Sequence, residues 1–297
     1  MKKKLNLYLT LTFAAGILLS LFMIYCFYNH VTVVNPYTTK NQLLPLVENA
    51  PAVTCFVICC IIAIALAVAV PVLTLPKAEL CASSKNNIFQ LFSTSLLGFL
   101  FGGYVFNFII TPFRKYWSVA EFPGVDLSTA DSLIKIVYYA GIIVSVPCAV
   151  YFLVLAVKNE FKPDSKIAVL SVSPVIWLSL RLVYYFISTS AQVNVAGRKI
   201  YIISLCFALF FFLQDSKRWI PYGDNKPSDK ESTKHSRLYL MSGFGAIISL
   251  LITHISFTYL QTFWIIEPTD SYLLNAIMIS MILFICFRLA GLSQKAE

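Results

Sequence analysis

An apolar segment near residue 180 carries four side chains that could bind a ligand. At the helical spacings i, i+4, i+7 and i+8 they fall on one face, and they are Trp177, Arg181, Tyr184 and Tyr185. Arginine supplies a permanent positive charge with several N–H donors, and each tyrosine adds a hydroxyl donor. A face of this kind is typical of a site that holds an anion by charge-assisted hydrogen bonds.

Arg181 is a charged residue inside an otherwise apolar segment. It lies about six residues from the end of that segment, which is roughly 9 Å at about 1.5 Å per residue. At the centre of a membrane helix a charge costs about 2.5–3.5 kcal/mol on the insertion scale. Two interpretations remain open: the guanidinium extends to the lipid headgroups, or it faces inward and binds a ligand.

Other polar residues occupy equivalent depths in neighbouring segments. His254 lies about eight residues from the end of its segment, although a lone histidine in a helix is more often a packing residue than a ligand. The candidate site consists of the four residues above and a second set: Asn107, Tyr138, Arg198, His254 and Asn275. Tyr104, Tyr139 and Tyr201 lie near them in sequence. We expect an outward-facing pocket that binds an anionic or hydrogen-bonding ligand.

Signatures of enzymes and cofactors are missing from the sequence. It contains no G-x-S-x-G, H-E-x-x-H or Walker A motif. All 14 acidic residues fall in expected loops or termini, which disfavours proton relays and intramembrane aspartyl chemistry. Cys55 and Cys59-Cys60 have no neighbouring histidine, so neither a metal nor a cofactor is predicted. The run Ser242-Gly243-Phe244-Gly245 is interpreted as a helix-packing patch.

The composition shows which elements must position these residues. Of 297 residues, 58% are hydrophobic and 12% charged, whereas soluble domains have about 25% charged residues. The mean hydropathy is +0.76. This excludes a soluble globular protein and predicts an all-α, polytopic bundle of transmembrane helices, in one integral membrane domain over residues 1–297.

Eight apolar runs are candidate spans, each to be compared with the roughly 20 residues that a bilayer requires. They are Leu5–Tyr28, Ala52–Leu75, Ile88–Thr111, Ile134–Ala156, Ile167–Ile187, Ile200–Leu213, Leu238–Thr262 and Tyr272–Leu292. The sixth has only 14 residues. It must extend outward toward Ala191 or inward through Trp219, and the sequence does not choose between the two.

The distribution of basic residues predicts the orientation. With both termini cytoplasmic, the outer segments hold six basic residues: Lys40, Arg114, Lys115, Lys135, Arg198 and Lys199. Apart from Arg181, the remaining 16 lie inside, in agreement with the positive-inside rule. The net charge of +9 is therefore an orientation signal and not a nucleic-acid surface. We expect a multi-pass plasma-membrane protein, and in a bacterium the cytoplasmic membrane.

Sequence similarity between the first and fifth spans suggests a parallel 4+4 repeat. The stretch 19–27 matches 178–186 at five of nine positions. The halves would be 1–158 and 166–297, and the second contains a polar cytoplasmic loop over 214–237. Chance similarity between apolar helices is the alternative.

These features favour a non-enzymatic, transporter-like or ligand-binding membrane module. Its expected partners are the lipid bilayer, an anionic small molecule or lipid, and a membrane protein partner. Two alternatives remain: a membrane enzyme acting on a lipid-linked substrate, and an accessory subunit of a membrane complex. The alanine-rich run 63–69 would permit the close helix contacts that an accessory subunit makes.

Overall fold

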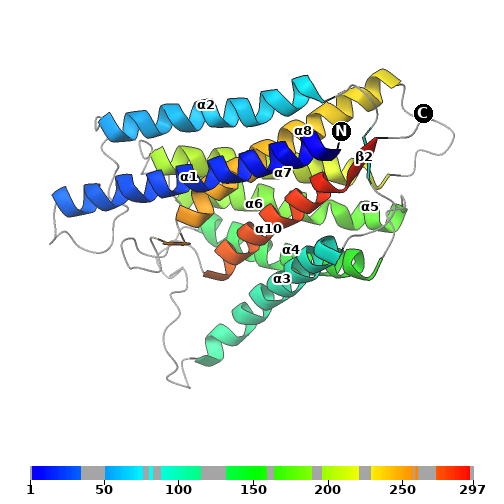
Figure 1. Ribbon diagram of the computed structural model, residues 1–297. Coiled ribbons are helices and arrows are strands. Elements are labelled where there is room, and N and C mark those ends of the chain that lie inside the picture. The colour runs from blue at the N-terminus through cyan, green and yellow to red at the C-terminus, as the bar shows by residue number, and fades with distance from the viewer. Residues whose placement is uncertain are drawn as a thin grey trace.

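The computed structural model describes residues 2–34, 51–75, 80–82, 88–114, 132–158, 164–188, 196–220, 229–256, 258–259 and 272–294. They form a bundle of long helices (Figure 1). The first four helices are α1 (Lys2–Val34), α2 (Pro51–Thr74), α3 (Ile88–Arg114) and α4 (Ser132–Val157). The others are α5 (Ser165–Ser171), α6 (Ser173–Ser188), α7 (Ala196–Lys217), α8 (Asp229–Leu250), the π-helix η1 (Leu251–Ile255) and α10 (Tyr272–Ala290).

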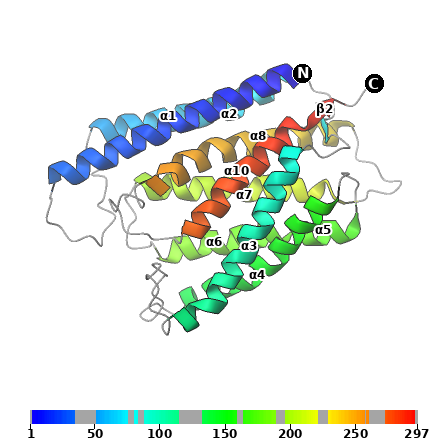
Figure 2. The ribbon, with the colours of Figure 1, turned by 60° about the horizontal axis from the view of Figure 1, so that its bottom comes forward.

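Within the described residues, eight helical segments are long and apolar enough to cross a membrane, as the apolar runs predicted. In this count α5 joins α6, and α8 joins η1, to make one segment each. Helices α1 and α2 lie side by side along one face, and α3 packs on α4 at the opposite face (Figures 1 and 2). Between them, α8 and η1 form the central helix, in contact with α1, α2, α7 and α10.

One end of the bundle carries a short strand pair, and we call it the strand end. Strands β1 (Leu80–Ala82) and β2 (Leu292–Gln294) are antiparallel, with Leu80 opposite Gln294. The start of α1 lies at the same end in both views (Figures 1 and 2). From sequence, residues 80–82 lay between two expected spans and Leu292 was the last residue of the eighth, so the strand pair is a feature that the sequence did not predict. Three residues a side are too few to give a sequence signal.

The short sixth span extends at both of its ends. Helix α7 begins four residues before the apolar run and ends four residues after it, at Lys217. Neither of the two expected alternatives alone was right. The polar loop expected over 214–237 is correspondingly shorter, because α7 continues to Lys217 and α8 begins at Asp229.

The fifth span is two helices, which break at Val172, between Ser171 and Ser173 and just before Pro174. Pro174 has no N–H to donate to the carbonyl of Leu170, four residues earlier. The Ser173 hydroxyl donates to that carbonyl instead, at 2.7 Å. This exchange satisfies the carbonyl inside an apolar environment, so the chain can change direction before α6.

Asp164 begins this fifth span as the N-cap of α5. Its carboxylate accepts the Lys166 backbone N–H at 2.9 Å and pairs with the Lys158 ammonium. The hydrogen bond from Lys158, followed by the bond from Lys166, lowers the pKa of Asp164 below its ordinary value. The end of α4 and the start of α5 are thereby held together through Lys158 and Asp164.

Glycines allow the central helix to approach its neighbours closely. A Cβ built at Gly245 of α8 would lie 2.4 Å from the Phe207 ring of α7, and one at Gly243 would lie 2.9 Å from Leu289 of α10. Gly16 of α1 is equally close to η1, with Leu251 at 2.7 Å. The expected packing role of the Ser242–Gly245 patch is therefore confirmed.

Candidate functional site

Helix α6 carries Arg181 into the interior of the bundle. The Arg181 side chain is 7% exposed, so it does not extend along the lipid-facing surface. Trp177, one turn earlier, is also buried, and its ring meets Phe101 of α3 edge-on at 5.0 Å. This contact fixes the rotation of α6 and turns the Arg181 face toward α4 and α7. Of the two interpretations of Arg181, the inward-facing one agrees with this burial.

The Arg181 side chain lies against one tyrosine, and further tyrosines pack beside its face of α6. Its guanidinium carbon lies 5.0 Å from the centre of the Tyr184 ring, within cation–π range. The Tyr184 ring is 5.9 Å from Tyr138 of α4, while Tyr185 stacks on Tyr201 of α7 at 4.1 Å. We name Trp177, Arg181, Tyr184, Tyr185, Tyr138 and Tyr201 the Arg181 cluster. The shared face expected from sequence is thus buried against three neighbouring helices, α3, α4 and α7.

His254 and Asn275 extend the cluster toward α10. The Nδ1 atom of His254 lies 3.1 Å from Oδ1 of Asn275, and the histidine ring is 5.2 Å from Tyr201. Both side chains are buried. Rings and polar groups therefore connect α6, α7, η1 and α10, which belong to the fifth, sixth, seventh and eighth of the expected spans.

The remaining expected members lie at the edge of the cluster. Asn107 is half-buried in α3, and the next residue, Phe108, packs on Tyr138 at 6.5 Å and on Tyr139 at 5.7 Å. Tyr139 itself is largely exposed. Arg198 belongs to the first turn of α7, and its side chain lies outside the described part of the molecule. The structure thus groups the candidates of α4, α6, η1 and α10 more tightly than that of α3.

The π-helix η1 is a feature that the sequence did not reveal. It contains His254, and its wider turns alter the usual backbone hydrogen bonding. Ser20 of α1 lies against it, with its Oγ 2.9 Å from the Leu251 carbonyl and 2.7 Å from the Gly16 carbonyl. Ser256 reaches back to the Ser20 carbonyl at 3.2 Å. Contacts with α1 therefore support the irregular segment that positions His254.

A second polar cluster lies at the strand end, and it corrects the expectation that no span contains an acid. Asp215 belongs to α7 and is 0% exposed. Arg288 of α10, counted from sequence with the inner charges, is buried beside it. Trp219, expected at the membrane interface, is also buried. We name Asp215, Arg288, Tyr239, Tyr151 and Trp219 the Asp215 cluster.

Both carboxylate oxygens of Asp215 have partners from other helices. Arg288 Nη2 donates to Oδ2 at 3.2 Å, and the Tyr151 hydroxyl lies 3.5 Å from the same oxygen. The Tyr239 hydroxyl donates to Oδ1 at 2.9 Å. Arg288 also faces the Trp219 ring, 5.5 Å from its centre. A buried charge requires such compensation, which here ties α4, α7, α8 and α10 together.

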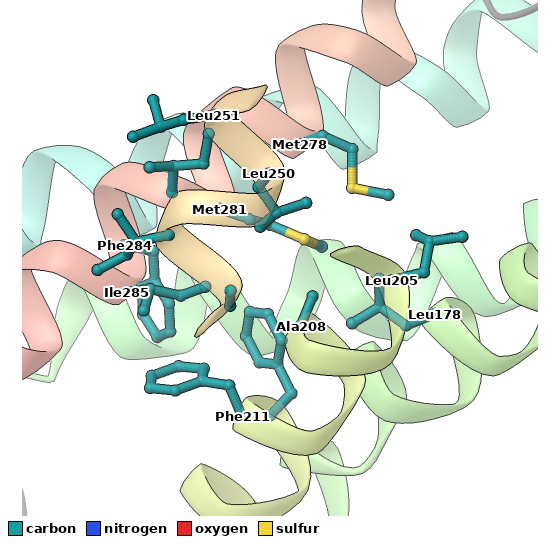
Figure 3. Close-up of a cluster of buried hydrophobic side chains, with 14 of the residues drawn as sticks. Leu178, Leu205, Ala208, Phe211, Leu250, Leu251, Met278, Met281, Phe284 and Ile285 are labelled. Atoms are coloured by element: carbon teal, nitrogen blue, oxygen red, sulfur yellow. The ribbon is translucent and has the colours of Figure 1, made fainter. Parts of the chain in front are cut away.

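Apolar side chains, drawn in Figure 3, form a layer that lies between the two clusters along α7 and α10. It is formed by α6, α7, α8, η1 and α10, through Leu178, Leu205, Ala208, Phe211, Leu250, Leu251, Met278, Met281, Phe284 and Ile285. Along α7 the order is Tyr201, then this layer, then Asp215, and at about 1.5 Å per residue the two ends are about 21 Å apart. The molecule therefore places a polar cluster at each end of a closed apolar centre.

Comparison with known proteins gives no relative: no protein-family model, no curated protein and no solved structure matches this chain.

Proposed function

We propose that the protein is a non-enzymatic membrane module that binds an anion at the Arg181 cluster and acts as a transporter or ligand-binding protein. The burial of Arg181 against the Tyr184 ring, on a face that also carries Tyr185, is the observation that carries this proposal. Burying a guanidinium in an apolar bundle is unfavourable, and intramembrane charges are therefore kept mainly where they serve a function. A positive charge beside several hydroxyl donors matches a carboxylate, phosphate or sulfate group.

The strand end is proposed to face the cytoplasm of a bacterial cell. Exposed basic side chains near that end include Lys3, Lys4, Lys158, Lys234 and Arg237, as the positive-inside rule requires. The Arg181 cluster then opens toward the outside. Anionic lipid and soluble anions of the medium share the chemistry that this cluster recognises.

The parallel 4+4 repeat remains a sequence hypothesis. In the second half, α7 packs along α8 over most of their length. The equivalent pair in the first half would be α2 and α3, and their described residues make no such extended contact. If the halves arose by duplication, their packing has diverged, and the proposed function does not depend on the repeat.

The proposal is tested with Arg181→Ala and with Lys199→Ala, which removes an exposed cation from the same end. The purified proteins are melted in detergent with inorganic phosphate, sulfate, citrate or short-chain phosphatidylglycerol. Saturation at 100 times Kd stabilises the binding state by about 2.7 kcal/mol, which is a shift of several degrees. We expect at least one anion to stabilise the wild type and Lys199→Ala, but not Arg181→Ala.

The anion that acts identifies the source of the ligand, because phosphatidylglycerol alone points to lipid and the inorganic ions to a soluble substrate. Two results would contradict the proposal. One is a folded Arg181→Ala variant that responds like the wild type. The other is a wild type whose melting temperature no member of the series changes.

A further inference from the structure

The Asp215 cluster joins four helices near the strand end. Tyr151, Asp215 and Arg288 lie near the ends of α4, α7 and α10, and Tyr239 lies at the middle of α8. Tyr151, Tyr239 and Arg288 each bring one polar group to the Asp215 carboxylate. Separation of any one helix from the others would therefore break a hydrogen bond or the ion pair.

An ion pair is a poor choice if the only requirement is to hold these helices together. Apolar side chains of similar volume often stabilise an interior as well as or better than a buried ion pair. What the pair adds is specificity, because it is satisfied in one helix arrangement only. The ion pair lies next to the well-packed apolar layer, so these helices already have hydrophobic contacts with one another.

The central helix connects this cluster to the Arg181 cluster. Tyr239 of α8 donates to Asp215, and His254 of the following η1 contacts Tyr201 and Asn275. Between them the helix changes from α to π geometry, a form that frequently marks functional sites. A shift of this helix would thus be felt at both polar clusters.

We propose that the Asp215–Arg288 pair is a latch that closes the strand end of the bundle and separates when that end opens. The need for such an opening rests on the proposed transport of an anion from the Arg181 cluster. In the structure described here the latch is closed, and the apolar layer is packed behind it. Opening exposes the interior of α4 and α10 to the cytoplasm.

A native thiol reports on this opening. Cys148 lies three residues before Tyr151 on α4 and is 0% exposed. The full-length protein in inside-out vesicles is treated with a membrane-impermeant sulfonated maleimide, and the labelled cysteines are identified by mass spectrometry. We expect Asp215→Asn to raise the labelling rate of Cys148 by about tenfold or more, because it leaves Arg288 without its counter-charge.

Ser216→Ala is the matched control. Ser216 is the next residue, and its hydroxyl donates to the Leu213 carbonyl within the same helix at 2.9 Å, so labelling should remain at the wild-type rate. Right-side-out vesicles provide the directional control, because Asp215→Asn should not raise Cys148 labelling from the opposite side.

Tyr239→Phe keeps the test decisive if Asp215→Asn does not fold. This variant removes one 2.9 Å hydrogen bond and leaves both charges in place, so we expect a smaller rise in labelling. Wild-type labelling of Cys148 in a folded latch variant would overturn the latch. The measurement uses no anion, and its outcome is therefore independent of whether the Arg181 cluster binds one.

Discussion

Asp215 brings a carboxylate into the interior of the bundle, where three side chains from other helices donate to it or lie close to it. The sequence hid this residue because Gln214-Asp215-Ser216-Lys217 follows an apolar run and has the polarity of a loop. The partners are 24 to 73 residues away, and no local pattern records such contacts. Arg181 was found from sequence because apolar residues flank it on both sides, which made its charge conspicuous.

The coupling between Asp215 and Arg288 can be measured as a difference in stability. Arg288→Met leaves the carboxylate buried without its cation, and we expect a loss of about 3–5 kcal/mol in the free energy of unfolding. The double variant Asp215→Asn/Arg288→Met carries no unpaired charge, so it should be more stable than Arg288→Met alone. Unfolding in mixed detergent micelles measures both.

Arg218→Met is the matched control for this comparison. The Arg218 guanidinium carbon lies 4.5 Å from the centre of the Tyr239 ring, a cation–π contact worth about 1 kcal/mol or less at a partly exposed position. If the loss of unfolding free energy in Asp215→Asn/Arg288→Met equals the sum of the losses in the two single variants, Asp215 and Arg288 do not stabilise each other.

At the scale of elements, the apolar runs predicted the eight described helical segments that are long and apolar enough to cross a membrane, because a bilayer requires a minimum length and low polarity of each. Helix ends were less predictable. The ends of α7 lie in polar sequence that packing holds in helical form. The π-helix had no signal at all: Leu251–Ile255 contains neither glycine nor proline, and its geometry depends on contacts with Ser20 and Gly16 of α1.

Close approach of α7 and α8 predicts a steric effect at Gly245. An added methyl group would overlap the Phe207 ring, and we expect Gly245→Ala to cost about 1–3 kcal/mol despite the better helix propensity of alanine. Gly102→Ala on α3 is the control, since its Cβ would meet no atom within 4 Å. That variant should be neutral or slightly stabilised. Equal melting temperatures for the two variants would contradict the packing described for Gly245.

For the whole molecule, composition alone predicted the class of fold, because 12% charged residues cannot cover a surface exposed to water. The counts of basic residues added an orientation. Neither could predict which helix is central. Helix α8 begins in a charged stretch that includes Lys234 and Arg237, yet it is the most buried of the eight, because small residues in its apolar part admit neighbours on all sides.

Reporter fusions test the eight-span topology and its orientation. Alkaline phosphatase is active only outside the cytoplasm. Green fluorescent protein fluoresces in the cytoplasm but not when it is exported in unfolded form. We expect fluorescence for fusions after residues 160, 225 and 297, and phosphatase activity after residue 190, because α5–α6 and α7 are each long and apolar enough to cross the membrane once. Phosphatase activity after residue 225 would show that α7 does not cross.

The distance in sequence between Asp215 and Arg288 also has a consequence for biosynthesis. The two residues are 73 positions apart, so at about 5–20 residues per second the ribosome needs several seconds to add the arginine after the aspartate. During that interval α7 is complete, but Asp215 does not yet have Arg288 as its ion-pair partner. Any chain that ends before α10 keeps this unneutralised acid permanently, and in this way a truncated product differs chemically from a finished one.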